Sequence, residues 1–236
     1  MRVILCDDEQ TLNERAADQL AAQLLLKPDS VLGLATGGTP VGTYEELIRR
    51  FMKGRLSFSK ATTLNLDEYV GLSPDHPQSY HAFMQEKLFS KVDIDPTRTH
   101  VPDGADPDPL RACRRYDRLC DSCGRIDLQL LGIGENGHIG FNEPAESFPT
   151  GCHIVELKEE TRRANARFFQ DEKEVPRRAI TVGIDRIMKA RRVVLLASGP
   201  RKEWAIEAML RGPVTPQVPA SILQLHPDCT VLYARG

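Results

Sequence analysis

Short apolar runs alternate along the chain with longer segments in which apolar residues return every three or four positions. The short runs, bounded by Gly, Pro or Asp, are typical of buried strands, and the longer period is typical of helices with one buried face. Expected strands cover residues 2–6, 31–35, 62–66, 126–131, 153–157, 179–183, 193–197 and 230–233. Expected helices cover residues 11–26, 40–48, 80–89, 109–121, 161–169, 184–188 and 201–210, with a short helical turn at 222–225.

This alternation of strands and helices predicts an α/β fold, built as a mostly parallel sheet with helices on both faces. Thr11, followed three residues later by Glu14, is expected to open the first helix with a capping box. Residues 91–108, which are rich in proline, are expected to form a surface connection. No repeat or linker divides the 236 residues, so one domain over residues 1–236 is expected.

Composition narrows the class of protein. The chain is 41% hydrophobic and 27% charged, which is normal for a soluble globular protein, and its net charge of −2 gives no reason to expect a nucleic-acid partner. No apolar run approaches the roughly 20 residues of a membrane span, and the N-terminus lacks the pattern of a signal peptide. A cytoplasmic protein with no membrane partner is therefore expected.

The six cysteines include one Cys-x-x-Cys pair, Cys120 and Cys123, at the end of an expected helix. A zinc site needs a second pair at a fitting spacing, and the sequence has none. A redox pair is the alternative, but such motifs open a helix after a strand, and this one does not. Free thiols and no bound metal are expected.

Four expected strands end in polar residues, at 36–39, 67–68, 135–143 and 198–202. In a parallel sheet these ends lie on one edge, where open α/β sheets place their chemistry. The turns at 36–39 and 198–202 lead directly into helices, and a glycine-rich turn at a helix N-terminus suits a phosphate. An ordinary strand–helix turn is the alternative reading of each.

The glycine-dense segment from Gly132 to Pro144 supplies one imidazole, His138, and two carboxylates, Glu135 and Glu143. These groups and Asp67 are the usual equipment for proton transfer. Together with the phosphate turns, they predict a phosphorylated small molecule that is handled by acid–base chemistry. A tight turn with solvated charges is the alternative.

The segment 132–137 also matches the dinucleotide fingerprint G-x-G-x-x-G, and Glu156 stands where the acid that binds the ribose is expected. The fingerprint requires a helix immediately after it. Gly140, Pro144 and Pro149 follow instead and forbid a long helix. A nicotinamide or flavin cofactor is therefore not expected.

Residues 34–40, 65–72, 132–144, 161–169 and 223–226 together resemble the glucosamine-6-phosphate deaminase family, and the resemblance runs nearly end to end. It implies a Rossmann-like domain shared with 6-phosphogluconolactonases. It also implies amino-sugar catabolism in which glucosamine 6-phosphate and water become fructose 6-phosphate and ammonia, with no metal or organic cofactor. A 6-phosphogluconolactonase-type hydrolase and a non-catalytic sugar-phosphate sensor remain the alternatives.

The resemblance also implies roles for four residues in the reaction. Asp67 corresponds to the general base that moves a proton from C2 to C1, and His138 to the acid–base that opens the sugar ring, oriented by Glu143. Many family members have an aspartate where this chain has Asn136. An amide carries no charge to share with the imidazole, so Glu143 is expected to orient His138 alone.

For the substrate phosphate, the resemblance implies a site formed by Gly38, Thr39, Arg167 and Lys202. Surface charge on a helix is the alternative for Arg167 and Lys202. Longer relatives carry a C-terminal extension involved in hexamer assembly and allosteric activation, whereas this chain stops soon after its last expected strand. A monomer is therefore expected rather than a hexamer.

Overall fold

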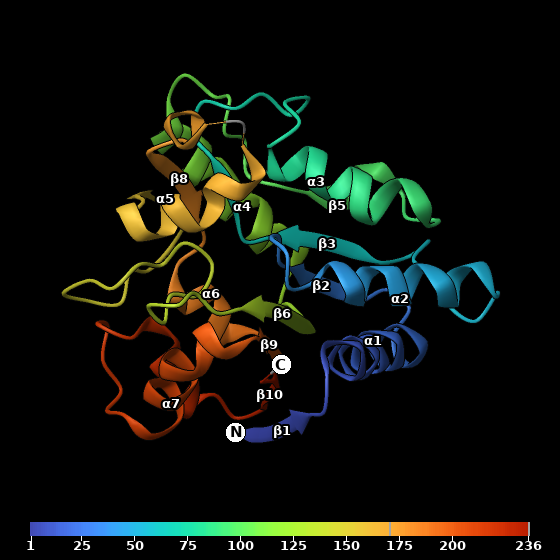
Figure 1. The fold of residues 1–236 in the computed structure, drawn as a ribbon. Coiled ribbons are helices and arrows are strands. Elements are labelled where there is room, and N and C mark those ends of the chain that lie inside the picture. Colours follow the sequence, from blue (N-terminus) through green and yellow to red (C-terminus); the bar gives the residue numbers. More distant parts are fainter. Residues whose placement is uncertain (170, 236) are drawn as a thin grey trace.

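The computed structural model describes residues 1–169 and 171–235, and its central feature is a parallel sheet of seven strands (Figure 1). Every pair of neighbouring strands in this sheet is parallel. In spatial order the strands are β1 (Arg2–Cys6), β10 (Cys229–Ala234), β9 (Arg192–Ser198), β6 (Leu128–Gly132), β2 (Val31–Leu34), β3 (Thr62–Asn65) and β5 (Thr99–His100). The predicted α/β fold is confirmed.

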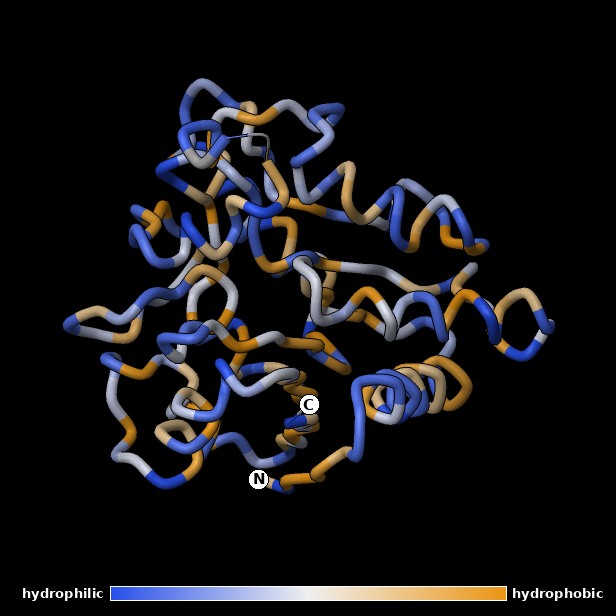
Figure 2. The backbone as a smooth tube through the Cα atoms, in the orientation of Figure 1, coloured by the Kyte–Doolittle hydropathy of each residue, from blue (hydrophilic) through white to orange (hydrophobic). Residues whose placement is uncertain are grey.

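Helices cover both faces of this sheet because alternate strand residues point to opposite sides. On one face, α1 (Glu9–Leu26), α2 (Val41–Met52) and α3 (Tyr80–Lys87) share a core with Leu32, Leu130 and Val194. On the other face, α4 (Pro109–Cys123), α6 (Ile184–Lys189) and α7 (Glu203–Arg211) pack on Leu131 and Leu195. Figure 2 shows hydrophobic residues concentrated on the central strands between these layers.

A second, antiparallel sheet of three strands stands beside the first. Its order is β4 (Asp67–Tyr69), β8 (Arg178–Thr181) and β7 (His153–Glu156). The sequence analysis placed Asp67 and Glu68 at the end of the preceding parallel strand. These residues do follow the carboxyl end of β3, which ends at Asn65, but they also form a strand that was not predicted, β4, in which Asp67 pairs with Thr181.

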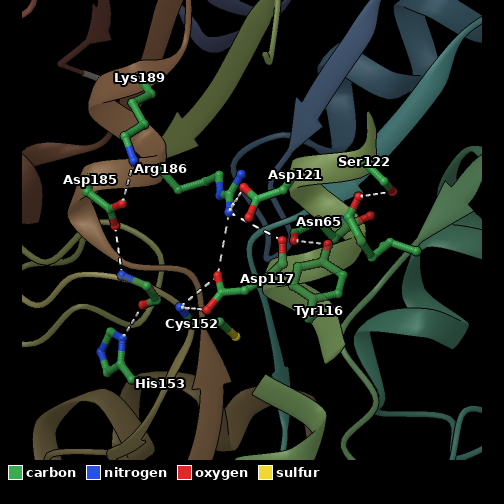
Figure 3. Close-up of polar contacts among 12 residues, drawn as sticks. Asn65, Tyr116, Asp117, Asp121, Ser122, Cys152, His153, Asp185, Arg186 and Lys189 are labelled. Atoms are coloured by element: carbon green, nitrogen blue, oxygen red, sulfur yellow. Dashed lines mark hydrogen bonds and ion pairs between the residues drawn. The ribbon is translucent and has the colours of Figure 1, made fainter. Parts of the chain in front are cut away.

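Polar contacts from α4 and α6 hold the second sheet against the body of the fold (Figure 3). Both carboxylate oxygens of Asp117 accept a hydrogen bond from the Cys152 N–H, at 3.0 and 2.9 Å, just before β7 begins. Asp185 accepts from the Gly151 N–H at 2.8 Å, and Arg186 pairs with Asp121 at 2.9 Å. The position of β4, and with it that of Asp67, is thus tied to the helices of the main sheet.

Several element boundaries differ from the sequence predictions. Asp8, not Thr11, caps α1, because its side chain accepts from the Thr11 N–H at 2.7 Å. Pro40 is the N-cap of α2 rather than its first residue. The segment 91–108, expected to form a surface connection, contains β5, whose Thr99 pairs with Thr63.

Two predicted helices divide into shorter pieces. The helix expected at 161–169 is α5 (Glu159–Asn165) followed by the 3₁₀ helix η3 (Ala166–Phe168). The helix expected at 201–210 is the 3₁₀ turn η5 (Pro200–Lys202) followed by α7. The remaining short 3₁₀ elements are η1 (Phe89–Lys91), η2 (Pro96–Arg98), η4 (Glu172–Glu174) and η6 (Pro219–Leu225).

The six cysteines, including Cys120 and Cys123 inside α4, are free thiols. Within residues 1–169 and 171–235, no helix is long and apolar enough to cross a membrane. The same residues contain no group of three or more His, Cys, Asp or Glu side chains that could hold a metal ion.

Candidate active site

A cleft of about 1190 Å³ opens at the carboxyl ends of β2, β6 and β9 and at the start of β4. Of the eight residues that the sequence analysis assigned to a site, seven line this cleft: Gly38, Thr39, Asp67, Asn136, His138, Arg167 and Lys202. The eighth, Glu143, is buried behind the lining and contacts Asn136 and His138. The structure therefore brings together residues that are as far apart in the sequence as Gly38 and Lys202.

The turn between β2 and α2 forms one end of the cleft. Gly37 has a φ of +91°, in the left-handed region that favours glycine, and the Tyr44 hydroxyl donates to the Ala35 carbonyl at 2.6 Å to hold the turn. No side chain caps the N-terminus of α2. The positive dipole end of α2 therefore follows directly on Gly38 and Thr39, which line the cleft, as suits an anion site.

Arg167, Arg201 and Lys202 line the same cleft as this turn. The Arg167 guanidinium lies so close to Gly38 that a β-carbon on that glycine would be 3.4 Å from Nη2. Lys202 is half-buried, and burial together with the charges of Arg167 and Arg201 lowers its pKa, while Glu135 opposes this. Glu135, whose role the sequence left open, pairs with Arg201 at 3.4 Å at the mouth of the cleft. This excess of positive charge suits a phosphate dianion.

We expect the Lys202→Ala variant to raise KM for the sugar phosphate far more than it lowers kcat. Loss of one charge-assisted contact costs about 1.5–3 kcal/mol, which corresponds to roughly a 10- to 150-fold rise in KM. Steady-state kinetics measure both constants, and Lys53→Ala, which removes an exposed lysine from the far end of α2, is the control. An unchanged KM would remove Lys202 from the site.

The proton-transfer end of the cleft is built on the glycine turn after β6. A β-carbon on Gly134 would lie 2.2 Å from the His138 ring, so only glycine leaves room for the imidazole. His138 Nδ1 lies 2.8 Å from Asn136 Oδ1, and Asn136 Nδ2 donates to Glu143 Oε2 at 2.8 Å. Glu143 Oε2 itself is 3.7 Å from His138 Nδ1.

This geometry corrects the expectation that Glu143 orients His138 alone. Because Glu143 can only accept, it fixes the Asn136 amide with Nδ2 toward the carboxylate and Oδ1 toward the imidazole. An acceptor beside Nδ1 holds the ring proton there and leaves Nε2 as the nitrogen that exchanges protons. Asn136 is therefore the direct partner of the imidazole, and Glu143 orients Asn136.

Glu143 is ionised throughout the working pH range. Burial opposes its charge, but the nearby His138 imidazole, together with Thr161 and the Asn136 amide, outweighs burial and holds the pKa of Glu143 at about 2. The Lys158 N–H, at the start of α5, also approaches Glu143 Oε1 at 3.4 Å. The Glu143 carboxylate therefore holds the Asn136–His138 pair through one oxygen and approaches the N-terminus of α5 with the other.

Asp67 is 5% exposed and lies in the cleft wall on β4. Burial, followed by the charge of Glu68, raises its pKa to about 8, although Thr36 opposes the shift. Gly140, with a φ of +58°, brings the loop after His138 so close that its β-carbon would be 3.5 Å from Asp67 Oδ2. A carboxylate with a raised pKa is a stronger base than an ordinary one.

The raised pKa of Asp67 gives a stability prediction with a definite sign. The ordinary value is 3.8, so between about pH 4 and 8 the unfolded chain releases a proton that the folded chain keeps, and the stability contributed by Asp67 is lost as pH rises. We expect Asp67→Asn to raise Tm at about pH 9 by at least 2–4 °C more than at about pH 5. Thermal melts at both pH values measure this, and equal shifts would contradict the buried ionised carboxylate.

Sequence reasoning missed some cleft residues. Tyr80, the first residue of α3, lines the cleft, as do Thr161 of α5 and the exposed Trp204 of α7. Ser79 correctly predicted a helix that begins at Tyr80. No local sequence pattern indicated that the N-terminus of this helix would line the cleft. Glu156, the acid of the apparent dinucleotide fingerprint, lies in β7 of the antiparallel sheet, and no helix follows Gly137 before residue 153.

The cleft combines a cation cluster with an acid–base relay, which is the equipment of an α/β enzyme that acts on a phosphorylated small molecule. A model of the family Glucosamine-6-phosphate isomerases/6-phosphogluconolactonase matches residues 7–232. The chain belongs to this family.

Within this family, the chain is similar over nearly its whole length to several glucosamine-6-phosphate deaminases. The chain is 56% identical to a glucosamine-6-phosphate deaminase of Lachnoclostridium phytofermentans, over 98% of both chains. It is 51% identical to that of Halothermothrix orenii, over 98% of this chain and 96% of the relative. A solved monomeric glucosamine-6-phosphate deaminase superposes with a TM-score of 0.98 and 49% identity, covering 100% of this chain and 98% of the other. The 6-phosphogluconolactonase of Thermotoga maritima shares the fold at a TM-score of 0.78 and 20% identity, covering 100% and 99%.

Proposed function

We propose that the chain converts glucosamine 6-phosphate and water into fructose 6-phosphate and ammonia. The observation that carries this proposal is a buried carboxylate, Asp67, in the same cleft as the His138 relay and the cation cluster. Deaminases that match over 98% of this chain support the same reaction.

The closed sugar ring masks the aldehyde at C1, so the first step is to open the ring. A proton leaves the C1 hydroxyl and another reaches the ring oxygen. His138 carries both transfers through Nε2, because Asn136 occupies Nδ1. The Glu143 charge behind Asn136 favours the protonated imidazole that forms when His138 acts as a base.

The second step moves a proton between carbon atoms. Asp67 takes the proton from C2 while the C1 carbonyl oxygen gains a proton, which gives an enolamine. Asp67 then returns its proton at C1 and the nitrogen gives up one proton in exchange for the one gained by the oxygen, so the aldehyde becomes a hydroxymethyl group and C2 becomes an imine. Water adds to the imine carbon, the carbon–nitrogen bond breaks, and ammonia leaves. Each step is a proton transfer or an addition of water, so the proposed reaction uses no metal and no organic cofactor.

A lactonase reaction is the second candidate, because family members with this fold include 6-phosphogluconolactonases. Hydrolysis of a lactone adds water to an acyl carbon and removes no proton from carbon. This reaction would use the phosphate site and His138, but it would give Asp67 no role in catalysis. A carboxylate of raised pKa held in the cleft wall favours the deaminase.

We further propose a monomer with one domain over residues 1–236. The solved deaminase that is 49% identical is described as monomeric, which supports the first part. The cytoplasmic location stays a prediction, as does the absence of a nucleic-acid or membrane partner.

The purified protein, supplied with glucosamine 6-phosphate, should release ammonia and fructose 6-phosphate in equal amounts. The parallel assay supplies 6-phosphogluconolactone and follows its hydrolysis. Ammonia without lactone hydrolysis supports the deaminase. Lactone hydrolysis without ammonia would replace it with the second candidate, and neither activity would leave a binding protein.

A further inference from the structure

Glu68 is a buried carboxylate next to Asp67 that no step of the proposed reaction uses. It is 2% exposed, and its partners are backbone N–H groups rather than a cation. Burial of a carboxylate without a positive partner costs free energy unless several hydrogen bonds compensate. The side chain therefore needs an explanation.

The hydrogen bonds of Glu68 join β4 to the start of α3. Oε1 accepts from the Tyr69 N–H at 2.8 Å and from the Tyr80 N–H at 2.9 Å, and Oε2 accepts from the His81 N–H at 3.0 Å. The first N–H groups of a helix lack partners inside the helix. Glu68 satisfies the first two of α3, which begins at Tyr80, and places a negative charge at the positive end of the helix dipole.

The N-cap Ser79 satisfies the next two N–H groups. Its hydroxyl accepts from the Ala82 N–H at 3.0 Å, and its carbonyl accepts from the Phe83 N–H at 3.0 Å. Ser79 thus completes an ordinary cap, while Glu68 fixes the helix end to β4, the strand that precedes α3 in the chain. This division of the bonds makes Glu68 the link between α3 and the strand of Asp67.

The helix end that Glu68 fixes carries Tyr80, which lines the cleft with Asp67. The Tyr80 ring stacks on Phe141, with centroids 5.8 Å apart and planes at 17°, and lies 4.9 Å from the ring of Tyr69. Phe141 directly follows Gly140, which approaches Asp67 from the other side. Tyr80 is therefore part of the apolar wall that keeps water from the Asp67 carboxylate.

We propose that Glu68 is a positioning residue for the deaminase reaction, clamping the N-terminus of α3 onto β4 so that Tyr80 closes the cleft wall beside Asp67. This inference rests on the proposed function. Glu68 does not touch the substrate. It acts through Tyr80, which shields the base, and through its own charge, which makes the neighbouring carboxylate harder to ionise and so a stronger base.

The titratable groups that surround Glu68 determine how a substitution there changes the pH dependence of kcat. Asp67 precedes it on β4, Tyr69 follows it, and Tyr80 and His81 face it from α3. Asp103, from the loop before α4, adds a further negative charge. Burial of the carboxylate, opposed by its backbone hydrogen bonds, raises the pKa of Glu68 to about 7, so it is ionised when the enzyme works above that pH.

The test is the Glu68→Gln variant, with kcat measured against pH. The amide keeps the shape and one acceptor but loses the charge and presents N–H to a backbone donor. We expect the acid limb of the kcat profile to move to lower pH, because the Asp67 pKa falls. We also expect kcat on the plateau to fall about 10-fold, which is less than the 10²-fold or more of a residue that itself transfers the proton.

Two further variants make the result specific. Glu86→Gln removes an exposed acid from the same helix and should leave the profile unchanged. Glu68→Asp keeps the charge on a shorter side chain, so it should lower kcat without moving the acid limb. A Glu68→Gln profile with the wild-type limb and plateau, or one whose only defect is a lower Tm, would overturn the proposal.

If Glu68→Gln does not fold, Tyr80→Leu tests the same wall. It leaves Glu68 in place but admits water to Asp67, so the acid limb should again move to lower pH, and an unmoved limb with wild-type kcat would overturn the proposal. Failure of the proposed function is distinguishable, because a wild type that releases no ammonia rejects the reaction itself before any variant is compared.

Discussion

Replacing Asp67 with asparagine should lower ammonia release from glucosamine 6-phosphate by at least about 10²-fold, the low end of what a positioned proton-transfer group contributes. Asparagine keeps the size and polarity of the side chain but cannot accept a proton from carbon. Binding should stay close to that of the wild type, because the cation cluster at Arg167 and Lys202 is separate from β4. Single-turnover rates and calorimetric titration measure the two quantities independently.

The matched control for this variant is Asp75→Asn, an exposed acid in the loop before α3. It should leave both quantities unchanged. An Asp67→Asn protein that makes fructose 6-phosphate at the wild-type rate would contradict the assignment of the base. Equal losses of rate and of binding would instead indicate that Asp67 holds the substrate without taking its proton.

The His138→Gln variant should show the second large effect, a loss of about 10²–10⁴-fold on the cyclic substrate. Glutamine can keep a hydrogen bond with Asn136 but cannot shuttle protons between the C1 hydroxyl and the ring oxygen. The small fraction of sugar that opens spontaneously in solution remains a substrate for Asp67. The residual rate should therefore become independent of enzyme concentration when the enzyme is abundant.

That saturation separates the two roles, because the His138→Gln variant can still use the open form, whereas the Asp67→Asn variant cannot. His76→Gln, a change in the surface loop before α3, is the control. A His138→Gln protein with the wild-type rate, or with a residual rate that stays proportional to enzyme concentration, would contradict ring opening by His138.

Much of this architecture follows from local patterns in the sequence. Most strands of the parallel sheet are short apolar runs, and the glycine turns at 36–39 and 132–140 line the cleft. Parallel topology alone then predicts that the polar ends at 36–39, 135–143 and 198–202 meet at one edge. Each of these elements depends on residues that are close together in the chain.

The features that sequence reasoning missed depend on how side chains and segments pack in three dimensions. Asp67 belongs to a second sheet because it pairs with Thr181, more than a hundred residues away, and nothing around residue 67 shows this. Glu68 looks like one of two surface acids until α3 is placed over it. From the sequence, Asn136 is expected only to lack the charge of an aspartate. In the structure, its amide donates to Glu143 and accepts from His138.

The central claim is that one positioned base, Asp67, carries a proton from C2 to C1. The direct measurement uses glucosamine 6-phosphate deuterated at C2, converted in heavy water, with the product examined by NMR at C1. The hydrogen that reaches C1 is then deuterium, whether it comes from C2 or from solvent that has exchanged with the base. The account predicts one deuterium at C1 in a single configuration, because a base fixed on β4 reaches only one face of the enolamine. Deuterium in both configurations in equal amounts would contradict it, since that pattern means that C1 is protonated by solvent and not by Asp67.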